Sequence, residues 1–324
     1  MDVRVSIIIP VKNAAADLAR LLDSIARLDY DPERLEVIVC DNGSEDETAE
    51  VARSRGCTLL SLPALSIAGL RNRGAEVARG DVLAFVDADC EVERGWIRAA
   101  LPHLRAPDVG AVGSYPLPPP DATWVQELWT LKERIKAPIH DAQWLPSMNF
   151  IVRRSVFLAL GGFSVALRTC EDVDLSYRMR RDGRRIVWDQ AVGVIHHGEP
   201  ATLRILYQKE RWHGRDNYRG LLHHGLRKEE IPSLVLPAAV LAAHILPFTA
   251  LAGSLLSSRA RRAFLVTSPL LALTPSVAAV AAGRIAWRAG RPRAFIRLGL
   301  IYWVYLIARA SALLPRDPIR PFMP

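Results

Sequence analysis

The sequence predicts an α/β domain built on a parallel sheet, followed by a group of membrane helices. Through residues 3–114, short apolar runs alternate with segments of helical periodicity, which is typical of a sheet covered by helices on both faces. Residues 233–314 are instead dominated by Leu, Ala, Val and Ile and contain very few acids. The 324-residue chain is long enough for one large domain or two smaller ones.

The expected elements follow from apolar spacing and from Pro and Gly breaks. The expected strands are 3–10, 35–40, 58–62, 82–86 and 109–114, with a later short strand at 192–195. The expected helices are 15–28, 44–55, 67–79, 96–104 and 125–136. The run PLPPP at 116–120 breaks the alternation, and an arginine-rich amphipathic stretch covers 202–225.

We expect a catalytic domain at 1–225, with halves at 1–115 and 116–225, and a membrane domain at 226–324. Residues 233–256 and 263–283 carry no charge, and each run is long enough to cross a bilayer. The third apolar run, 294–314, is interrupted by Arg297 and Arg309. It fits either a short span with snorkelling arginines or a helix in the membrane interface. Buried core helices are the alternative for all three runs.

The charges give a mixed signal about topology. No signal-peptide pattern is present at the start, so residues 1–230 are expected on the cytoplasmic side of the cell membrane. Four arginines at 284–293 suit a cytoplasmic loop, whereas three at 259–262 would then lie on the far side. The net charge of +8 favours anionic lipid head groups as partners, and no nucleic-acid motif accompanies it.

Two carboxylates, Asp87 and Asp89, directly follow the apolar strand at 82–86. Such a pair can hold a hard divalent cation, which in turn can bridge a diphosphate. An isolated Asp-x-Asp is more often a turn or a helix cap. Asp41 ends the strand at 35–40, so it should point into the same crevice beyond the carboxyl ends of the strands.

Several further residues are candidates for the same site. Arg71 suits phosphate, and Asp172, beside Glu171, suits a general base, although acids at a helix start are commonly caps. His196 and His197 close the short strand at 192–195, and one of them could join Asp89 at a metal. Helical spacing puts Gln208, Arg211 and Trp212 on one face, for phosphate and a sugar ring or for a membrane surface. Cys40, Cys57, Cys90 and Cys170 show no zinc-site spacing.

Taken together, these motifs resemble the inverting family 2 glycosyltransferases, which have the GT-A fold. The start SIIIPVKN, Asp41 with Ser44, Arg71 and Asp87-x-Asp89 are similar to the nucleotide-sugar half of that family. Glu171-Asp172 and Gln208-x-x-Arg211-Trp212 are similar to the acceptor half, and 35 residues lie between Asp172 and Gln208. The resemblance covers about residues 3–225 and does not extend to the apolar tail.

The resemblance implies a role for each matching residue. Asp172 would be the catalytic base with Glu171 beside it, Asp89 would hold Mg²⁺ or Mn²⁺ with a histidine, and Asp87 would lie by the diphosphate. Gln208, Arg211 and Trp212 would meet the acceptor and the pyrophosphate. The donor, a nucleotide sugar with uridine as the expected base, would be bound by Pro10, Asn13, Asp41, Ser44, Arg71 and Asp87.

The expected function is therefore an inverting transfer of a sugar to a lipid-linked or membrane-proximal saccharide acceptor, in cell-envelope polysaccharide or glycolipid synthesis. A processive polysaccharide synthase and a catalytically silent saccharide-binding membrane subunit remain as alternatives. A dinucleotide oxidoreductase is disfavoured because no G-x-G-x-x-G follows the first strand. A phosphatase with an Asp nucleophile would leave Asp41 and Asp172 without a role.

Overall fold

The computed structural model describes residues 3–214, 231–254 and 257–314, and the chain divides into two units. The first unit comprises residues 1–120 and 137–198, and the second comprises 121–136 and 199–324. This division differs from the boundary expected near residue 225. Two helices of soluble composition, at Trp124–Arg134 and Leu203–His213, belong with the apolar helices of the second unit.

The first unit is built on an eight-stranded mixed sheet with the order β3-β2-β1-β4-β8-β6-β9-β7. A two-stranded sheet pairs β5 with β10 in antiparallel register. The strands are β1 (Val5–Val11), β2 (Leu35–Asp41), β3 (Thr58–Ser61), β4 (Val82–Val86), β5 (Cys90–Val92), β6 (Val109–Gly113), β7 (Ile139–Asp141), β8 (Asn149–Arg153), β9 (Arg185–Asp189) and β10 (Val194–His196).

The expected parallel sheet is interrupted by one antiparallel strand, and beyond it β6 and β9 again pair in parallel. Strands β1 to β4 pair in parallel, as the strand–helix alternation predicts. Strand β8 then inserts antiparallel between β4 and β6, so β4 and β6 do not pair directly. Strand β8 runs opposite to its two neighbours in a sheet that is buried on both faces. A buried strand gives an apolar run whichever way it runs, so the sequence does not show whether it is parallel or antiparallel.

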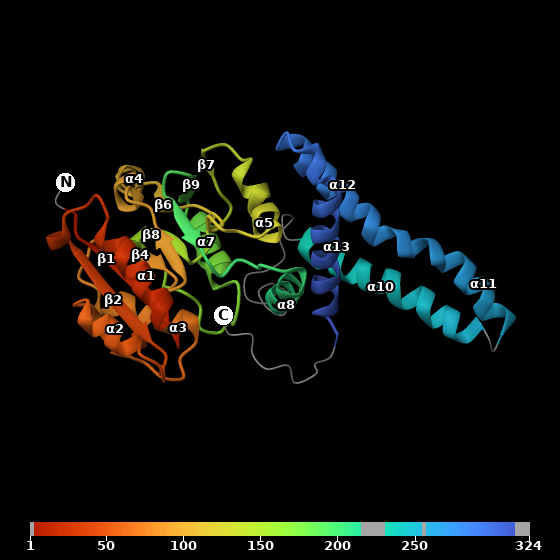
Figure 1. Ribbon diagram of the computed structural model, residues 1–324, viewed down its shortest axis with the longest axis horizontal. Helices are drawn as coiled ribbons and strands as arrows, with labels where there is room; N and C mark the ends of the chain where they lie inside the picture. The colour runs from red at the N-terminus through yellow and green to blue at the C-terminus, as the bar shows by residue number, and fades with distance from the viewer. Residues whose placement is uncertain (1–2, 215–230, 255–256, 315–324) are drawn as a thin grey trace. The chain divides into compact units, whose positions relative to one another are not determined.

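Helices cover both faces of this sheet, because β1 alternates its side chains between two separate cores. Ile7 and Ile9 pack into one core with α1 and α4, whereas Ile8 packs into the other with α3, α6 and α7. Figure 1 shows these helices around the strands of the first unit. The helices are α1 (Ala15–Ala26), α2 (Thr48–Ser54), α3 (Ile67–Val77), α4 (Trp96–Leu104), α6 (Arg154–Ala159) and α7 (Glu171–Arg181).

Helix α3 approaches the sheet unusually closely. A Cβ at Gly74 would come within 2.6 Å of the Ile8 side chain and 2.9 Å of the Cys40 sulfur. Only glycine therefore fits here, and the close contact fixes the height of α3 above strands β1 and β2. Arg71, one turn earlier on the same helix, is positioned by this packing.

The second unit consists of helices, most of them strongly apolar. Three described segments are long and apolar enough to cross a membrane: Ile231–Ser254, Ser258–Arg288 and Pro292–Ser311. They match the expected runs at 233–256, 263–283 and 294–314 within a few residues, although α8 accounts for only 203–213 of the expected amphipathic stretch. Residues 215–225 of that stretch lie outside the described part of the chain. The helices are α5 (Trp124–Arg134), α8 (Leu203–His213), α10 (Ile231–Ser254), α11 (Ser258–Thr267), α12 (Leu273–Arg288) and α13 (Phe295–Ser311).

Candidate active site

The acidic residues after β2 and β4 lie at one edge of the sheet. Val11 at the end of β1 pairs with Asp41 at the end of β2, and β4 runs parallel to β1 and leads directly into Asp87. In sheets of this kind the crevice beyond the carboxyl ends of the strands is the usual ligand site. The observed edge is therefore the one where the sequence predicted a donor site.

The buried side chain of Arg71 bridges two acidic residues at this edge. Its side chain is 2% exposed, and its guanidinium donates to Asp87 Oδ1 at 2.5 Å and to Glu171 Oε1 at 2.8 Å. Glu171 begins α7, 100 residues further along the chain. The planar guanidinium can serve two carboxylates at once, which a lysine ammonium does less well.

This inward position differs from the phosphate contact expected for Arg71. The guanidinium carbon also lies 5.7 Å from the centre of the Phe163 ring, and both guanidinium amino groups are used by carboxylates. A neighbouring residue, Asn72, adds a second link by bonding the N–H and the C=O of Phe163. Arg71 therefore acts as a bridge between α3, β4 and α7, and a direct phosphate contact stays a prediction.

Asp172 follows Glu171 and is only half-buried. Its Oδ2 accepts the backbone N–H of Ser147 at 3.0 Å, and its Oδ1 accepts that of Val173 at 2.8 Å. Ser147 also lies 3.4 Å from Glu171 through its hydroxyl. Sequence reasoning missed Ser147, because its role depends on a backbone N–H in a loop before β8 and no side-chain pattern marks such a donor.

Burial and the neighbouring charge of Glu171 raise the pKa of Asp172 to about 7, against the opposing effect of its two backbone hydrogen bonds. A carboxyl group with a pKa near neutrality accepts a proton more readily than an ordinary aspartate and is still largely ionised at slightly alkaline pH. Its environment therefore suits the general base that the sequence assigned to it.

The Asp89 side chain meets one of the two predicted histidines. His196 Nε2 lies 3.1 Å from Asp89 Oδ2, and β10 carries His196 there by pairing with β5, where His196 lies opposite Cys90. Ligand atoms of Asp89, His196 and Cys90 all lie within 4.8 Å of one another. A Cβ at Gly198 would fall 2.1 Å from Asp89 Oδ2 and 2.8 Å from His196 Nε2, so the missing side chain leaves room beside both ligand atoms.

Asp89 fits a divalent cation of the Mg²⁺ or Mn²⁺ kind through its carboxylate oxygen, and the imidazole of His196 is a ligand more typical of transition metals than of Mg²⁺. The Cys90 thiol is a soft ligand that these ions do not prefer. His197 turns elsewhere, with Nε2 2.7 Å from Glu91 Oε1. The sequence offered the two histidines as equals, and the structure brings only the ring of His196 to Asp89.

The remaining donor-half residues build the turn after β2. The N–H of Ser44 donates to Asp41 Oδ1 at 3.1 Å, and Asn13 bonds this turn twice, through its own N–H to Ser44 Oγ and through Oδ1 to the N–H of Glu45. Pro10 lies in β1 beyond the last residue paired with β4, where a missing N–H is tolerated. Contacts of these residues with a nucleoside stay predictions.

Gln208, Arg211 and Trp212 lie on α8 of the second unit. Gln208 is exposed, and Arg211 and Trp212 are half-buried. The residue between them, Glu210, points the other way and is buried. The predicted common face of the three residues is therefore consistent with the helix, and their roles toward acceptor and diphosphate stay predictions.

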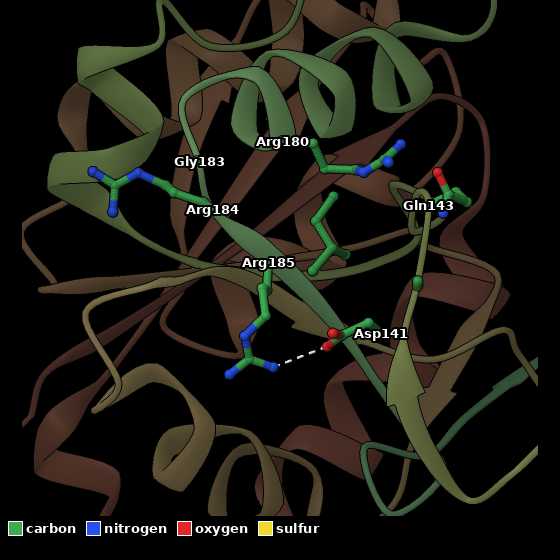
Figure 2. A pocket seen from close by; sticks show the side chains of 8 residues that line it. Asp141, Gln143, Arg180, Gly183, Arg184 and Arg185 are labelled. Carbon is green, nitrogen blue, oxygen red and sulfur yellow. Dashed lines mark hydrogen bonds and ion pairs between the residues drawn. The ribbon is translucent and has the colours of Figure 1, made fainter. Parts of the chain in front are cut away.

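A separate hollow of about 300 Å³ lies at the start of β9, lined by Gln143, Arg180, Arg184 and their neighbours (Figure 2). Strand β9 runs parallel to β6, so its first residue lies at the edge of the sheet opposite to Asp87. Arg185 forms ion pairs with Asp108 and Asp141, and Arg184 forms one with Asp182. This cavity is not part of the acidic site.

Comparison with known proteins points to one family. Residues 6–161 match the model described as Glycosyl transferase family 2. The chain is 27% identical over 223 residues to the pre-mycofactocin glycosyltransferase of Mycobacterium tuberculosis, covering 65% of this chain and 46% of that protein. It is 28% identical over 207 residues to the glycosyltransferase AglE of Haloferax volcanii, covering 60% and 67%.

A solved structure shares the fold. The mannosyltransferase PcManGT from Pyrobaculum calidifontis, in complex with GDP-Man and Mn²⁺, aligns with a TM-score of 0.61 at 20% identity. The alignment covers 95% of this chain and 86% of that one. The GT-A-type fold expected from the motifs is thereby confirmed, whereas the chain spans only about half the length of the first curated relative that it matches.

We expect Arg71→Met to destabilise the protein strongly, because two buried carboxylates then lose their counter-charge. Breaking such a buried pair costs about 3–5 kcal/mol, which corresponds to a melting temperature lower by about 6 °C or more. The matched control is Arg73→Met on the same helix, whose side chain is 54% exposed and should cost below about 0.5 kcal/mol. Equal melting temperatures for the two variants in a thermal unfolding assay would contradict the bridging role of Arg71.

Proposed function

We propose that this chain, whose residues 6–161 match the family 2 glycosyltransferases, transfers a sugar, with inversion, from a nucleotide-sugar donor to an acceptor at a membrane. The observation that carries the proposal is the chain of contacts from Asp172 and Glu171 through Arg71 to Asp87. It links a carboxyl group suited to act as a base with the sheet edge suited to a diphosphate. Enzymes of this class need both groups at fixed separation.

The chemistry assigned to the chain's own residues is a single displacement. Asp172 accepts the proton of the acceptor hydroxyl while that oxygen attacks the anomeric carbon of the donor sugar. The bond from that carbon to the diphosphate breaks on the opposite side, so its configuration is inverted. Glu171, held in place by its ion pair with Arg71, supports the base through the negative charge that raises the pKa of Asp172. Asp89 and His196 would hold Mg²⁺ or Mn²⁺, which when bound offsets the charge of the departing nucleoside diphosphate.

The donor nucleotide is proposed to be UDP-linked, with GDP as the direct competitor. The solved mannosyltransferase contains GDP-Man, and the uridine assignment rests on the resemblance of the motifs alone. Residues Asp41, Ser44 and Asn13 are proposed to bind the nucleoside. Their fixed turn supports this, because it presents a rigid rim beside the acidic edge.

The acceptor is proposed to be lipid-linked or to lie close to the bilayer, with the first unit on the cytoplasmic side of the cell membrane. The three apolar helices support a membrane location. One relative is named for a glycolipid product, the beta-monoglucosyldiacylglycerol synthase of Trichormus variabilis. It is 24% identical over 227 residues, and the match covers 64% of this chain and 48% of that protein. A saccharide acceptor without a lipid remains the main competitor.

We expect Asp172→Asn to keep donor binding and to lose transfer by a factor of about 10² to 10⁴, because only the base is removed. The matched control is Asp182→Asn just beyond the other end of α7, which should transfer at the parental rate. Donor binding is measured by calorimetry and transfer by release of nucleoside diphosphate from a set of nucleotide sugars. Near-parental transfer by Asp172→Asn would overturn the base assignment, and absence of transfer in the parent chain across UDP-, GDP- and dTDP-sugars would favour the silent-subunit alternative.

The rate should also depend on pH through the same residue. Below a pH of about 7 the base is protonated, so kcat/KM should fall about tenfold per pH unit toward acid and level off above it. In Glu171→Gln the negative neighbour is gone, so the pKa of Asp172 falls and the acid limb moves to lower pH. A limb that stays in place in Glu171→Gln would show that another group controls it.

A further inference from the structure

Helix α13 differs from the other two apolar segments in what surrounds it. It has the lowest mean hydropathy of the three candidate spans. It packs against α5 and α8, two short helices that carry charged residues, as well as against α10 and α12. A helix that crosses a bilayer passes its middle through the hydrocarbon centre, so the charges beside that middle decide whether it can do so.

Charged groups lie beside the middle of α13. The Trp129 ring of α5 packs on Tyr302 and Tyr305, with ring centres 6.4 Å and 5.7 Å apart. The Lys132 ammonium, on the same helix as Trp129, lies 4.5 Å from the centroid of that ring. If α13 crossed the bilayer, Lys132 and its neighbour Glu133 would be held near the hydrocarbon centre, where a charged side chain is strongly unfavourable.

Charged groups also lie at both ends of α13. Near its start, the Arg297 guanidinium lies over the Trp124 ring at 5.6 Å. Near its end, Arg309 Nε lies 3.3 Å from the buried carboxylate of Glu210 on α8, and Tyr207 bonds Ser311 at 3.0 Å. Burial alone would raise the pKa of Glu210, but His213 and Arg309 outweigh it and lower that pKa to about 2, so the carboxylate is charged at neutral pH.

The other two segments form a hairpin, and α13 crosses its base. Figure 1 shows α10 and α11 side by side, joined at the tip, with α13 at the opposite end. Near the tip, a Cβ at Gly253 would approach the Ala260 Cβ to 3.1 Å, which brings the two helices close. At the base, Ala282 and Ala286 of α12 share a core with Leu298 and Ile301 of α13.

One face of α13 is left apolar and exposed. Ile296, Leu300 and Trp303 follow each other at spacings of four and three residues and are 79%, 37% and 47% exposed. The helix thus has polar partners on one side and an exposed apolar stripe on another, and a helix that lies in the membrane interface likewise turns one apolar face to the lipid. A tryptophan on such a stripe is well suited to the headgroup boundary.

We propose that, of the described helices, only α10 and the continuous segment α11–α12 cross the membrane, and that α13 lies on the bilayer surface with its apolar stripe toward the lipid acyl chains. The occupant of the stripe is then the bilayer itself, because the stripe adjoins the base of the spanning hairpin. It follows that the two ends of α13 are on the same side of the membrane, and that the hairpin tip is on the other.

Cysteine labelling in the full-length chain tests this placement. Single substitutions Ser258→Cys, Arg293→Cys and Leu314→Cys report the hairpin tip, the start of α13 and the residues after its end. All three positions are exposed. A membrane-impermeant maleimide is added to intact cells and to permeabilised cells, and the unsubstituted chain, with half-buried Cys57 and Cys170, gives the background on the side of the first unit.

We expect Arg293→Cys and Leu314→Cys to behave alike, with labelling only after permeabilisation, and Ser258→Cys to label in intact cells. This result is expected whatever sugar is transferred. Labelling of Arg293→Cys and Leu314→Cys from opposite sides would overturn the proposal and make α13 a third span. Should either variant fail to accumulate, Arg288→Cys and a cysteine added after residue 324 report the same two ends and carry the same two outcomes.

Discussion

The structure depends most on the buried guanidinium of Arg71. It joins Asp87, which ends the parallel part of the sheet, to Glu171, which begins α7 beside the candidate base. An isolated charge at this depth would be very unfavourable, so the two carboxylates and the arginine stabilise each other only as a set. Because Gly74 lets α3 lie close against β1 and β2, the position of Arg71 is fixed by backbone packing rather than by a flexible side chain. The separation of Asp87 from Glu171 and its neighbour Asp172 is thereby set by the core.

The second unit uses the same kind of interaction for another purpose. Arg309 and Glu210 pair where α8 meets α13, and Gly214 allows close approach, since a Cβ there would lie 2.8 Å from that of Ala312. Leu206 of α8 is fully buried in the core that α5, α12 and α13 share. Because Leu206 and Glu210 must be buried on one face of α8, the face with Gln208 and Arg211 points away from that core. In both units an arginine paired with a carboxylate joins two segments that are distant in the chain, although Arg71 is buried and Arg309 is half-buried.

Much of the first unit could be predicted from the sequence, because its signals are local. Strand β4 and helix α4 are found at the expected residues, and Asp87, Asp89 and Glu171 lie at the ends of elements as the sequence predicts, although their roles stay predictions. Features that depend on distant contacts could not be predicted in the same way. Four features require the pairing of segments far apart in the chain. They are the antiparallel insertion of β8, the hydrogen bond from the N–H of Ser147 to Asp172, the inward position of Arg71 and the different directions of His196 and His197.

The most direct test of the donor site is calorimetric titration of UDP and GDP into the detergent-solubilised protein, with Mn²⁺ and then with a chelator. We expect binding of one of the two nucleotides to require the metal, to disappear in Asp89→Ala and to persist in His197→Ala, whose ring faces Glu91. Binding that survives both the chelator and Asp89→Ala would contradict a metal-assisted diphosphate site at the end of β4.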